Sequence, residues 1–337
     1  MALTIGGTAR RIGLALSGGG FRAAAFHLGV MRRLAALGIL EHVDLFTCVS
    51  GGSIAGATVV KHWADPARLD ILDRYLRTRS IAVSSVIGGV LDPFEDRLDK
   101  LAASYDRDLF DGATLDGLGG GPRLYVNATN LATGNLFFFV TGGGKPAEMG
   151  EHELGVVGAP GFPVCRAVAA SSAFPPVFPP LRLDASSYAH ASSVEYVTLT
   201  DGGVYDNMGI NPLVRARNAL DYVIVSDGGK PFALDERPTE SGAIVLKAAL
   251  DIMMEQIRGL EFDRLQHRHA ALKGPQPLWF SIDSREGEAQ AGDAAFASSI
   301  KTNLTRLGRE EMDVLTRHGG ALVEARIRRY APELIGA

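Results

Sequence analysis

The sequence predicts an α/β protein of three layers (α/β/α), in which helices cover both faces of a mostly parallel central sheet. The main observation is that residues 12–37 and residues 44–63 each contain a short apolar run, a glycine-rich turn and a helical pattern. Two strands joined through a helix run parallel. The composition agrees, since 46% of the 337 residues are hydrophobic and 21% are charged. These values exclude a disordered, collagenous or coiled-coil protein.

The first unit has an apolar strand at 12–16, a turn at 17–20 with three glycines, and a helix expected from 23 to 37. Gly38 supplies the helix stop. The glycines expose backbone N–H groups at a helix N-terminus, where they could bind a phosphate or stabilise an oxyanion. The turn matches neither a P-loop nor a dinucleotide fingerprint. An anion site beside Arg22 and a simple tight turn both remain open.

The second unit has a strand at 44–49, which ends at Ser50, and a helix expected over 53–63. A serine between a strand and a helix can project its hydroxyl from the sheet, as in a nucleophile elbow. The usual elbow reads G-x-S-x-G, and here Cys48 replaces the first glycine. Ser53 is the competing hydroxyl, although we expect it to cap or begin the helix. An ordinary N-cap role also remains open for Ser50.

The middle of the chain is expected to be helical over 65–110, with an apolar interlude at 81–90. This interlude is either a flap that engages a membrane or a buried helical segment. Strands at 123–127 and 136–140 are predicted to form a hairpin around the turn at 133–135.

Two later strands, at 194–199 and 222–226, are each followed by Asp-Gly-Gly, which begins at Asp201 and Asp227 respectively. Strand ends of an α/β sheet face the ligand crevice, so either carboxylate could accept a proton from a serine. Burial would have to raise its basicity. Because Asp-Gly also forms ordinary turns, the residues themselves do not choose between the two.

A histidine base is the alternative. Only His267, His269 and His318 follow the candidate aspartates in the chain, as the order serine, acid, histidine requires. The first two lie in a polar helical pattern, and His318 lies in a predicted helix break before the glycine pair at 319–320. None of the three follows a strand, so this alternative ranks below an aspartate base.

The chain is divided into a core at 10–230 and a mainly helical C-terminal region at 231–337, which we expect to pack on the core as one continuous domain. The expected C-terminal elements are helices near 241–272, 296–316 and 319–330 and a strand at 278–282.

Four blocks within residues 17–213 resemble the patatin-like phospholipases in order and spacing: SGGGFRAAAFHLGVMRRL, CVSGGSIAGA, AASSAFPPVFPPL and DGGVYDNMGINPL. The first also resembles the cytosolic phospholipases A2, which share that core. The resemblance implies a patatin-like fold and a serine acyl hydrolase of the lipase or phospholipase A type. Such an enzyme cleaves lipid esters at a membrane or micelle surface.

The resemblance also implies a dyad of Ser50 and Asp201, and so favours Asp201 over Asp227. It implies no cofactor and no metal. The loop that it implies for the oxyanion hole consists of Gly18, Gly19, Gly20, Phe21 and Arg22.

Three other functions remain: a non-lipid carboxylesterase or an acyltransferase on the same dyad, and a catalytically inactive lipid-binding protein. The net charge of −4 argues against a nucleic-acid partner. Neither a signal peptide nor an apolar stretch of about 18–20 residues is present. We therefore expect a cytoplasmic protein that contacts membranes only peripherally; the sequence leaves its oligomeric state open.

Overall fold

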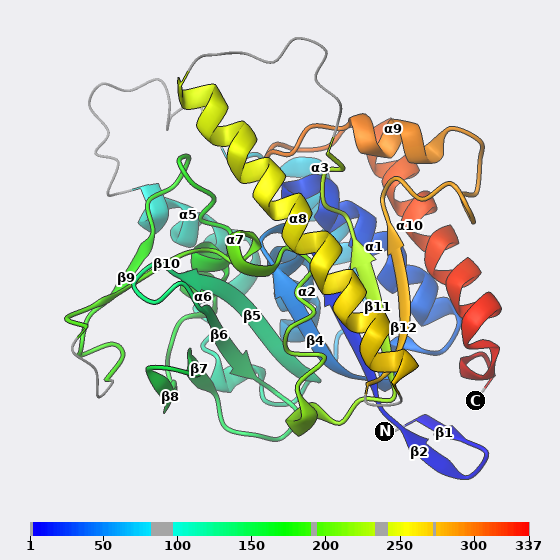
Figure 1. The fold of residues 1–337 in the computed structure, drawn as a ribbon, viewed down its shortest axis with the longest axis horizontal. Helices are drawn as coiled ribbons and strands as arrows, with labels where there is room; N and C mark the ends of the chain where they lie inside the picture. Colours follow the sequence, from blue (N-terminus) through cyan, green and yellow to red (C-terminus); the bar gives the residue numbers. More distant parts are fainter. Residues whose placement is uncertain (1–2, 82–96, 190–193, 233–241, 272–273, 337) are drawn as a thin grey trace.

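The computed structural model describes residues 3–81, 97–189, 194–232, 242–271 and 274–336 (Figure 1). Residues 82–90 of the apolar interlude lie outside the described residues.

A ten-stranded mixed sheet forms the middle layer. The strands are β3 (Ile12–Leu16), β4 (Val43–Val49), β5 (Arg123–Asn130), β6 (Leu136–Thr141), β7 (Glu148–Glu151), β8 (Gly155–Gly158), β9 (Leu181–Leu183), β10 (Val197–Asp201), β11 (Tyr222–Asp227) and β12 (Gln276–Ser281). Neighbours in the order β12-β11-β3-β4-β5 run parallel. The strands β6, β7 and β8 continue the sheet antiparallel on one side of β5, and β10 with β9 pairs antiparallel on its other side. A separate hairpin joins β1 (Leu3–Ile5) to β2 (Thr8–Arg10).

Helices lie on both faces of the sheet (Figure 1). They are α1 (Gly20–Ala36), α2 (Gly51–Lys61), α3 (Arg68–Thr78), α5 (Arg97–Tyr105), α6 (Val164–Ser171), α7 (Gly203–Asp206), α8 (Gly242–Ala270), α9 (Asp293–Ser299) and α10 (Arg309–Tyr330). Short helical turns are η1 (Leu40–His42), η3 (Asp106–Phe110), η4 (Asp116–Leu118), η5 (Ala216–Asn218) and η6 (Pro332–Leu334).

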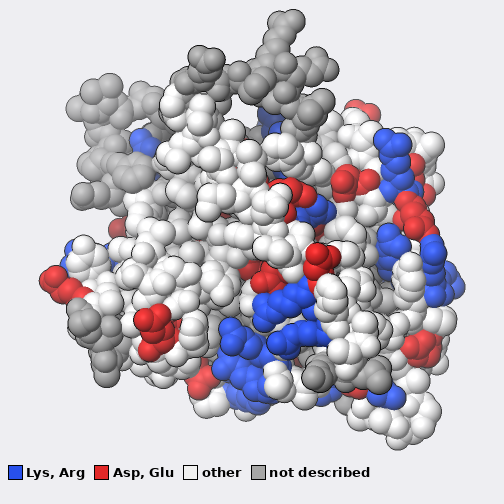
Figure 2. Space-filling model, in the orientation of Figure 1, with Lys and Arg blue, Asp and Glu red and all other residues white. Residues whose placement is uncertain are grey.

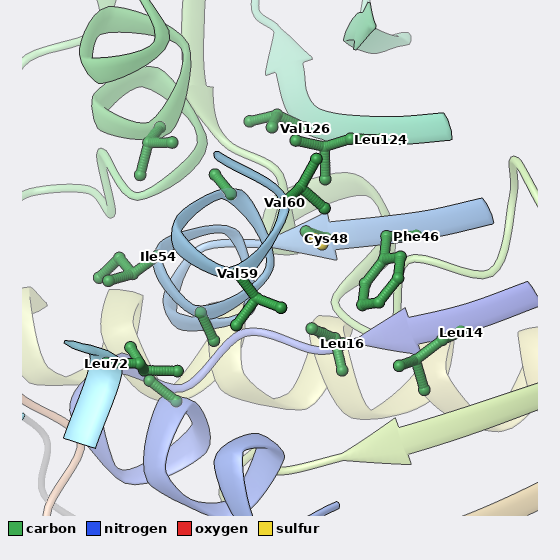
Figure 3. Packing of buried hydrophobic residues seen from close by; sticks show 14 of the residues in the cluster. Leu14, Leu16, Phe46, Cys48, Ile54, Val59, Val60, Leu72, Leu124 and Val126 are labelled. Carbon is green, nitrogen blue, oxygen red and sulfur yellow. The ribbon is translucent and has the colours of Figure 1, made fainter. Parts of the chain in front are cut away.

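The two faces of the sheet carry separate hydrophobic cores. Successive residues of a strand contribute to opposite cores, because side chains along a strand alternate between the faces of a sheet. In β4, Phe46 and Cys48 face the larger core, which includes residues of α1, α2 and α10 (Figure 3). Leu45 faces the smaller core, which includes Leu265 of α8. The predicted three-layer α/β/α fold is therefore confirmed, with an antiparallel part added to its parallel centre.

The C-terminal residues share this sheet and core. β12 pairs in parallel with β11, and the larger core extends from Leu3 to Leu334.

The predicted break before Gly319 is wrong, since residues 309–330 form the single helix α10. Glycine serves here to let two helices approach. A Cβ on Gly319 would lie 2.3 Å from the carbonyl oxygen of Phe26 in α1, and a Cβ on Gly29 would lie 2.1 Å from that of Thr316. Close contact between α1 and α10, rather than helix termination, explains these glycines.

The unusual cysteine of the elbow is accommodated by a glycine in α2. A Cβ on Gly56 would lie 2.3 Å from Sγ of Cys48, and both residues are buried. We expect Gly56→Ala to lower the free energy of unfolding by about 1–3 kcal/mol through overpacking. The second change Cys48→Ala should restore most of it, because it removes the clashing sulfur. Denaturant unfolding of both single variants and the double variant measures this coupling; purely additive effects would contradict it.

Candidate active site

Strand β5 brings the ends of β4 and β10 together. Val49, the last residue of β4, is in register with Asn127 of β5. Asp201, the last residue of β10, is in register with Ala128, the next residue of β5. Because β4 runs parallel and β10 antiparallel to β5, the two strands meet end to end along its edge. Ser50 and Asp201, far apart in the sequence, therefore lie next to each other.

Ser50 forms a strained turn between β4 and α2. Its φ of 52° and ψ of −117° belong to the region that favours glycine, and surrounding contacts must hold such a backbone in place. Its N–H donates to Oγ of Ser171 (3.0 Å), whose own hydroxyl donates to the carbonyl oxygen of Asn127 (2.6 Å). The Ser53 hydroxyl donates to the same Ser171 oxygen (2.8 Å). Ser53 is fully buried, whereas Ser50 is half-buried.

Asp201 is a buried carboxyl with one oxygen engaged. Its Oδ1 accepts the Gly203 N–H at 2.7 Å, and its Oδ2 has no regular hydrogen bond to any described residue. Burial raises the pKa of Asp201 to about 7, and the Gly203 N–H and the nearby Ser50 hydroxyl limit that rise. A carboxyl with this pKa can both accept and return a proton near neutral pH.

Ser171, at the end of α6, and the residues after it hold both halves of the pair. The Ser171 side chain accepts from Ser50, and its carbonyl oxygen accepts the Gly202 N–H at 3.2 Å. The Asp201 N–H donates to the carbonyl oxygen of Ala173 at 3.2 Å. One short segment thus positions the elbow and the end of β10.

The glycine-rich loop lies directly against the elbow. A Cβ on Gly51 would lie 2.1 Å from the carbonyl oxygen of Gly20. Two loop N–H groups are engaged, since Gly18 donates to the carbonyl oxygen of Asn207 (3.0 Å) and Phe21 to that of Asn303 (2.9 Å). The N–H groups of the residues between them, Gly19 and Gly20, donate to no group in the described part of the chain.

Arg22 is fully buried beneath this loop. Its Nη1 donates to the carbonyl oxygen of Ile300 (3.0 Å) and its Nη2 to that of Gly228 (3.1 Å). Burial lowers its pKa to about 10, although nearby Asp227 opposes that shift. Arg22 therefore ties the glycine-rich loop to the segments around it.

Asp227 has a different environment from Asp201. Its Oδ2 accepts from Nε of Arg258 at 2.6 Å, and its Oδ1 accepts the Gly229 N–H at 3.1 Å. The Asp227 carboxyl is thus paired with a cation from α8.

The candidate histidines hydrogen-bond elsewhere. His318 is buried, and its Nε2–H donates to the carbonyl oxygen of Ile282 at 2.9 Å. His267 is exposed, and its Nδ1–H donates to the carbonyl oxygen of Asp263 at 2.7 Å. None of the contacts described for His267, His269 or His318 is with Ser50 or Asp201.

Comparison with known proteins identifies the family of this chain. The sequence model of the family described as patatin-like phospholipase matches residues 14–214, which is more than half of the chain. The chain belongs to the patatin-like phospholipase family. A search of curated proteins returned no match.

Solved structures show the same fold. The patatin-like chain is similar to human GIVD cytosolic phospholipase A2, with 15% identity and a TM-score of 0.59 over 96% of this chain and 60% of that chain. The same human protein in complex with methyl gamma-linolenyl fluorophosphonate gives 14% identity and a TM-score of 0.59, over 96% and 59% of the two chains. This patatin-like chain thus spans about three fifths of the length of these structures.

Two contributors to the patatin-like site are not evident from sequence reasoning. Ser171 lies in the third family-like block, but nothing local shows that its hydroxyl meets Ser50. His27 in α1 is fully buried and bonds Ser226 Oγ (2.8 Å) and the carbonyl oxygen of Ser17 (2.9 Å). Burial lowers its pKa to about 4, so a neutral imidazole supports the start of the glycine-rich loop. The roles of Ser171 and His27 both depend on contacts between segments that are distant in the sequence.

Proposed function

We propose that this patatin-like protein is a serine acyl hydrolase of the lipase or phospholipase A type, with Ser50 as nucleophile and Asp201 as base. The observation that supports it most is the meeting of β4 and β10 along β5, which puts the Ser50 hydroxyl beside a buried carboxyl. Family membership supports lipid esters as substrates.

The first step is proton transfer. A serine hydroxyl is a weak nucleophile without a base, and Asp201 with a pKa of about 7 is ionised in part of the molecules at neutral pH. Asp201 accepts the Ser50 proton while Oγ attacks the ester carbonyl carbon. The carboxyl then protonates the leaving alcohol, and an acyl group remains on Ser50.

The negative oxygen of the tetrahedral intermediate requires donors. The Gly19 and Gly20 N–H groups, with no partner among the described residues, lie at the start of α1, where the helix dipole adds positive potential. Of the five loop residues expected from sequence, we assign the donation to these two, with Gly18, Phe21 and Arg22 holding the loop. A single such donor is worth about 10²–10³ in kcat. Water, activated by Asp201, then releases the acyl group.

Labelling with a fluorophosphonate probe, followed by peptide mapping, tests the assignment. We expect the label on Ser50, and strongly reduced labelling in Asp201→Asn. Absence of labelling in the folded wild-type protein would contradict the proposal and favour an inactive lipid-binding protein.

Asp227→Asn is the matched control for this experiment. It should keep the label on Ser50 but lower the free energy of unfolding by about 1–3 kcal/mol, since it removes the charge that Arg258 pairs with. Solvent screens part of this interaction, because the Arg258 side chain is 22% exposed. Loss of labelling in folded Asp227→Asn, with Asp201→Asn unaffected, would transfer the role of base to Asp227.

A further inference from the structure

Helix α8 presents an apolar side to solvent. With 100° between successive residues, the exposed apolar side chains fall within about one third of the helix circumference. We call them the α8 face: Val245 (47% exposed), Leu246 (73%), Ile252 (46%), Met253 (62%) and Leu260 (69%). A surface helix normally has the opposite orientation, with its apolar side toward the protein.

Three charged side chains in the C-terminal half of α8 contact the protein and hold the loops of the site. Arg258 pairs with Asp227 at 2.6 Å. Glu261 accepts from Nδ2 of Asn211 at 3.2 Å, and Arg264 donates to Oδ1 of the same Asn211 at 3.0 Å. These contacts anchor α8 to the end of β11 and to the segment that follows β10. They account for the inward charges but leave the outward apolar side unexplained.

The position of α8 connects this face to the site. Figure 1 shows α8 lying across the sheet, with its N-terminal half extending past the arrowhead of β11. This is the end of the parallel strands at which Ser50 follows β4. Whatever binds the α8 face therefore lies at the catalytic end of the molecule.

Exposed cations lie near the C-terminal end of the same helix. Arg215 and Arg217 are exposed in the segment that packs against the C-terminal half of α8, where Arg268 donates to the carbonyl oxygen of Val214 at 2.9 Å. Figure 2 shows Lys and Arg side chains gathered by the lower half of α8, with mostly uncharged atoms over its upper half. An exposed apolar helix side with arginines toward one end of the helix suits a bilayer with anionic headgroups. A symmetric dimer through this surface would bring like charges together.

We propose that the α8 face, with Arg215 and Arg217 near the C-terminal end of the helix, binds anionic phospholipid bilayers and so presents the catalytic end to lipid. The idea that the bilayer supplies substrate rests on the proposed hydrolase function, but binding of the bilayer to the α8 face does not. Within the described ranges, no helix combines the length and apolar character needed to cross a bilayer.

Flotation with phosphatidylcholine vesicles, with and without phosphatidylserine, tests the proposal on the full chain. The wild type should bind the vesicles with phosphatidylserine. The combined change Leu246→Glu and Met253→Glu should reduce this binding at least about tenfold, since it places charge in the bilayer contact. Combined Arg215→Gln and Arg217→Gln should reduce binding only to the anionic vesicles, by about fivefold for each arginine. Leu131→Glu, at an apolar position 55% exposed outside α8, is the matched control.

Wild-type levels of binding in the Leu246→Glu and Met253→Glu variant, or failure of the wild type to bind either vesicle, would overturn the proposal. So would a wild-type dimer in analytical ultracentrifugation that this variant loses, because the face would then be a contact between copies. Hydrolysis of a soluble short-chain ester is measured in parallel and should be unchanged in every variant. If the wild type lacks that activity but floats with anionic vesicles, the proposed function fails and the docking surface stands.

Discussion

Asp201→Asn is expected to reduce ester hydrolysis by about 10²–10⁴-fold, the usual contribution of a general base, and to stabilise the protein at alkaline pH. Asparagine has nearly the same shape as aspartate, and its Oδ1 can still accept the Gly203 N–H. It cannot accept the Ser50 proton. Wild-type activity should rise with pH and level off above about 7, where Asp201 is ionised. The residual activity of the variant should lack this titration.

The stability change has a defined sign. Burial raises the pKa of Asp201 from 3.8 to about 7, so the folded protein binds this proton more tightly than the unfolded chain does. The resulting stabilisation is complete below about pH 4 and is lost as the pH rises through about 7. Asparagine does not titrate, and the variant should therefore be about 2–4 kcal/mol more stable than the wild type near pH 8.

Urea unfolding of both proteins near pH 5 and near pH 8 measures this difference. The advantage of Asp201→Asn should be larger at the higher pH. An equal difference at both values would show that Asp201 does not titrate in this range and would contradict its assignment as a base poised near neutrality.

Ser50→Ala and Ser50→Gly should both reduce hydrolysis by about 10³–10⁶-fold, the range expected when a covalent nucleophile is removed. They should differ in stability. The φ of 52° at this position strains alanine but not glycine. Ser50→Gly should therefore be about 1 kcal/mol more stable than Ser50→Ala, once the greater freedom of glycine in the unfolded chain is subtracted.

Thermal unfolding and steady-state hydrolysis of a soluble ester, measured on both variants, check the two parts separately. Hydrolysis at the wild-type rate in either variant would remove Ser50 from the mechanism. Equal stability would mean that the elbow relaxes without the hydroxyl.

Much of the fold is predictable because its signals are local. The strand over 12–16 agrees with β3 at Ile12–Leu16, and the helix expected over 53–63 agrees with α2 within two residues. The hairpin of β5 and β6 is confirmed as well. These elements follow from hydrophobic periodicity and from glycine at turns, which act within a few residues. The same local rule fails at Gly319, because the approach of α1 is not visible in the sequence of α10.

The sequence by itself determined the two strand–turn–helix units, the glycine-rich loop and the serine at the elbow, since each depends on backbone preferences of adjacent residues. Only the tertiary structure distinguished the environments of Asp201 and Asp227, whose local Asp-Gly-Gly sequences are identical. Antiparallel pairing with β5 places Asp201 beside Ser50, whereas α8 supplies Arg258 to Asp227. The tertiary structure alone also turned the apolar side of α8 outward, because the ion pairs that orient this helix join residues distant in the chain.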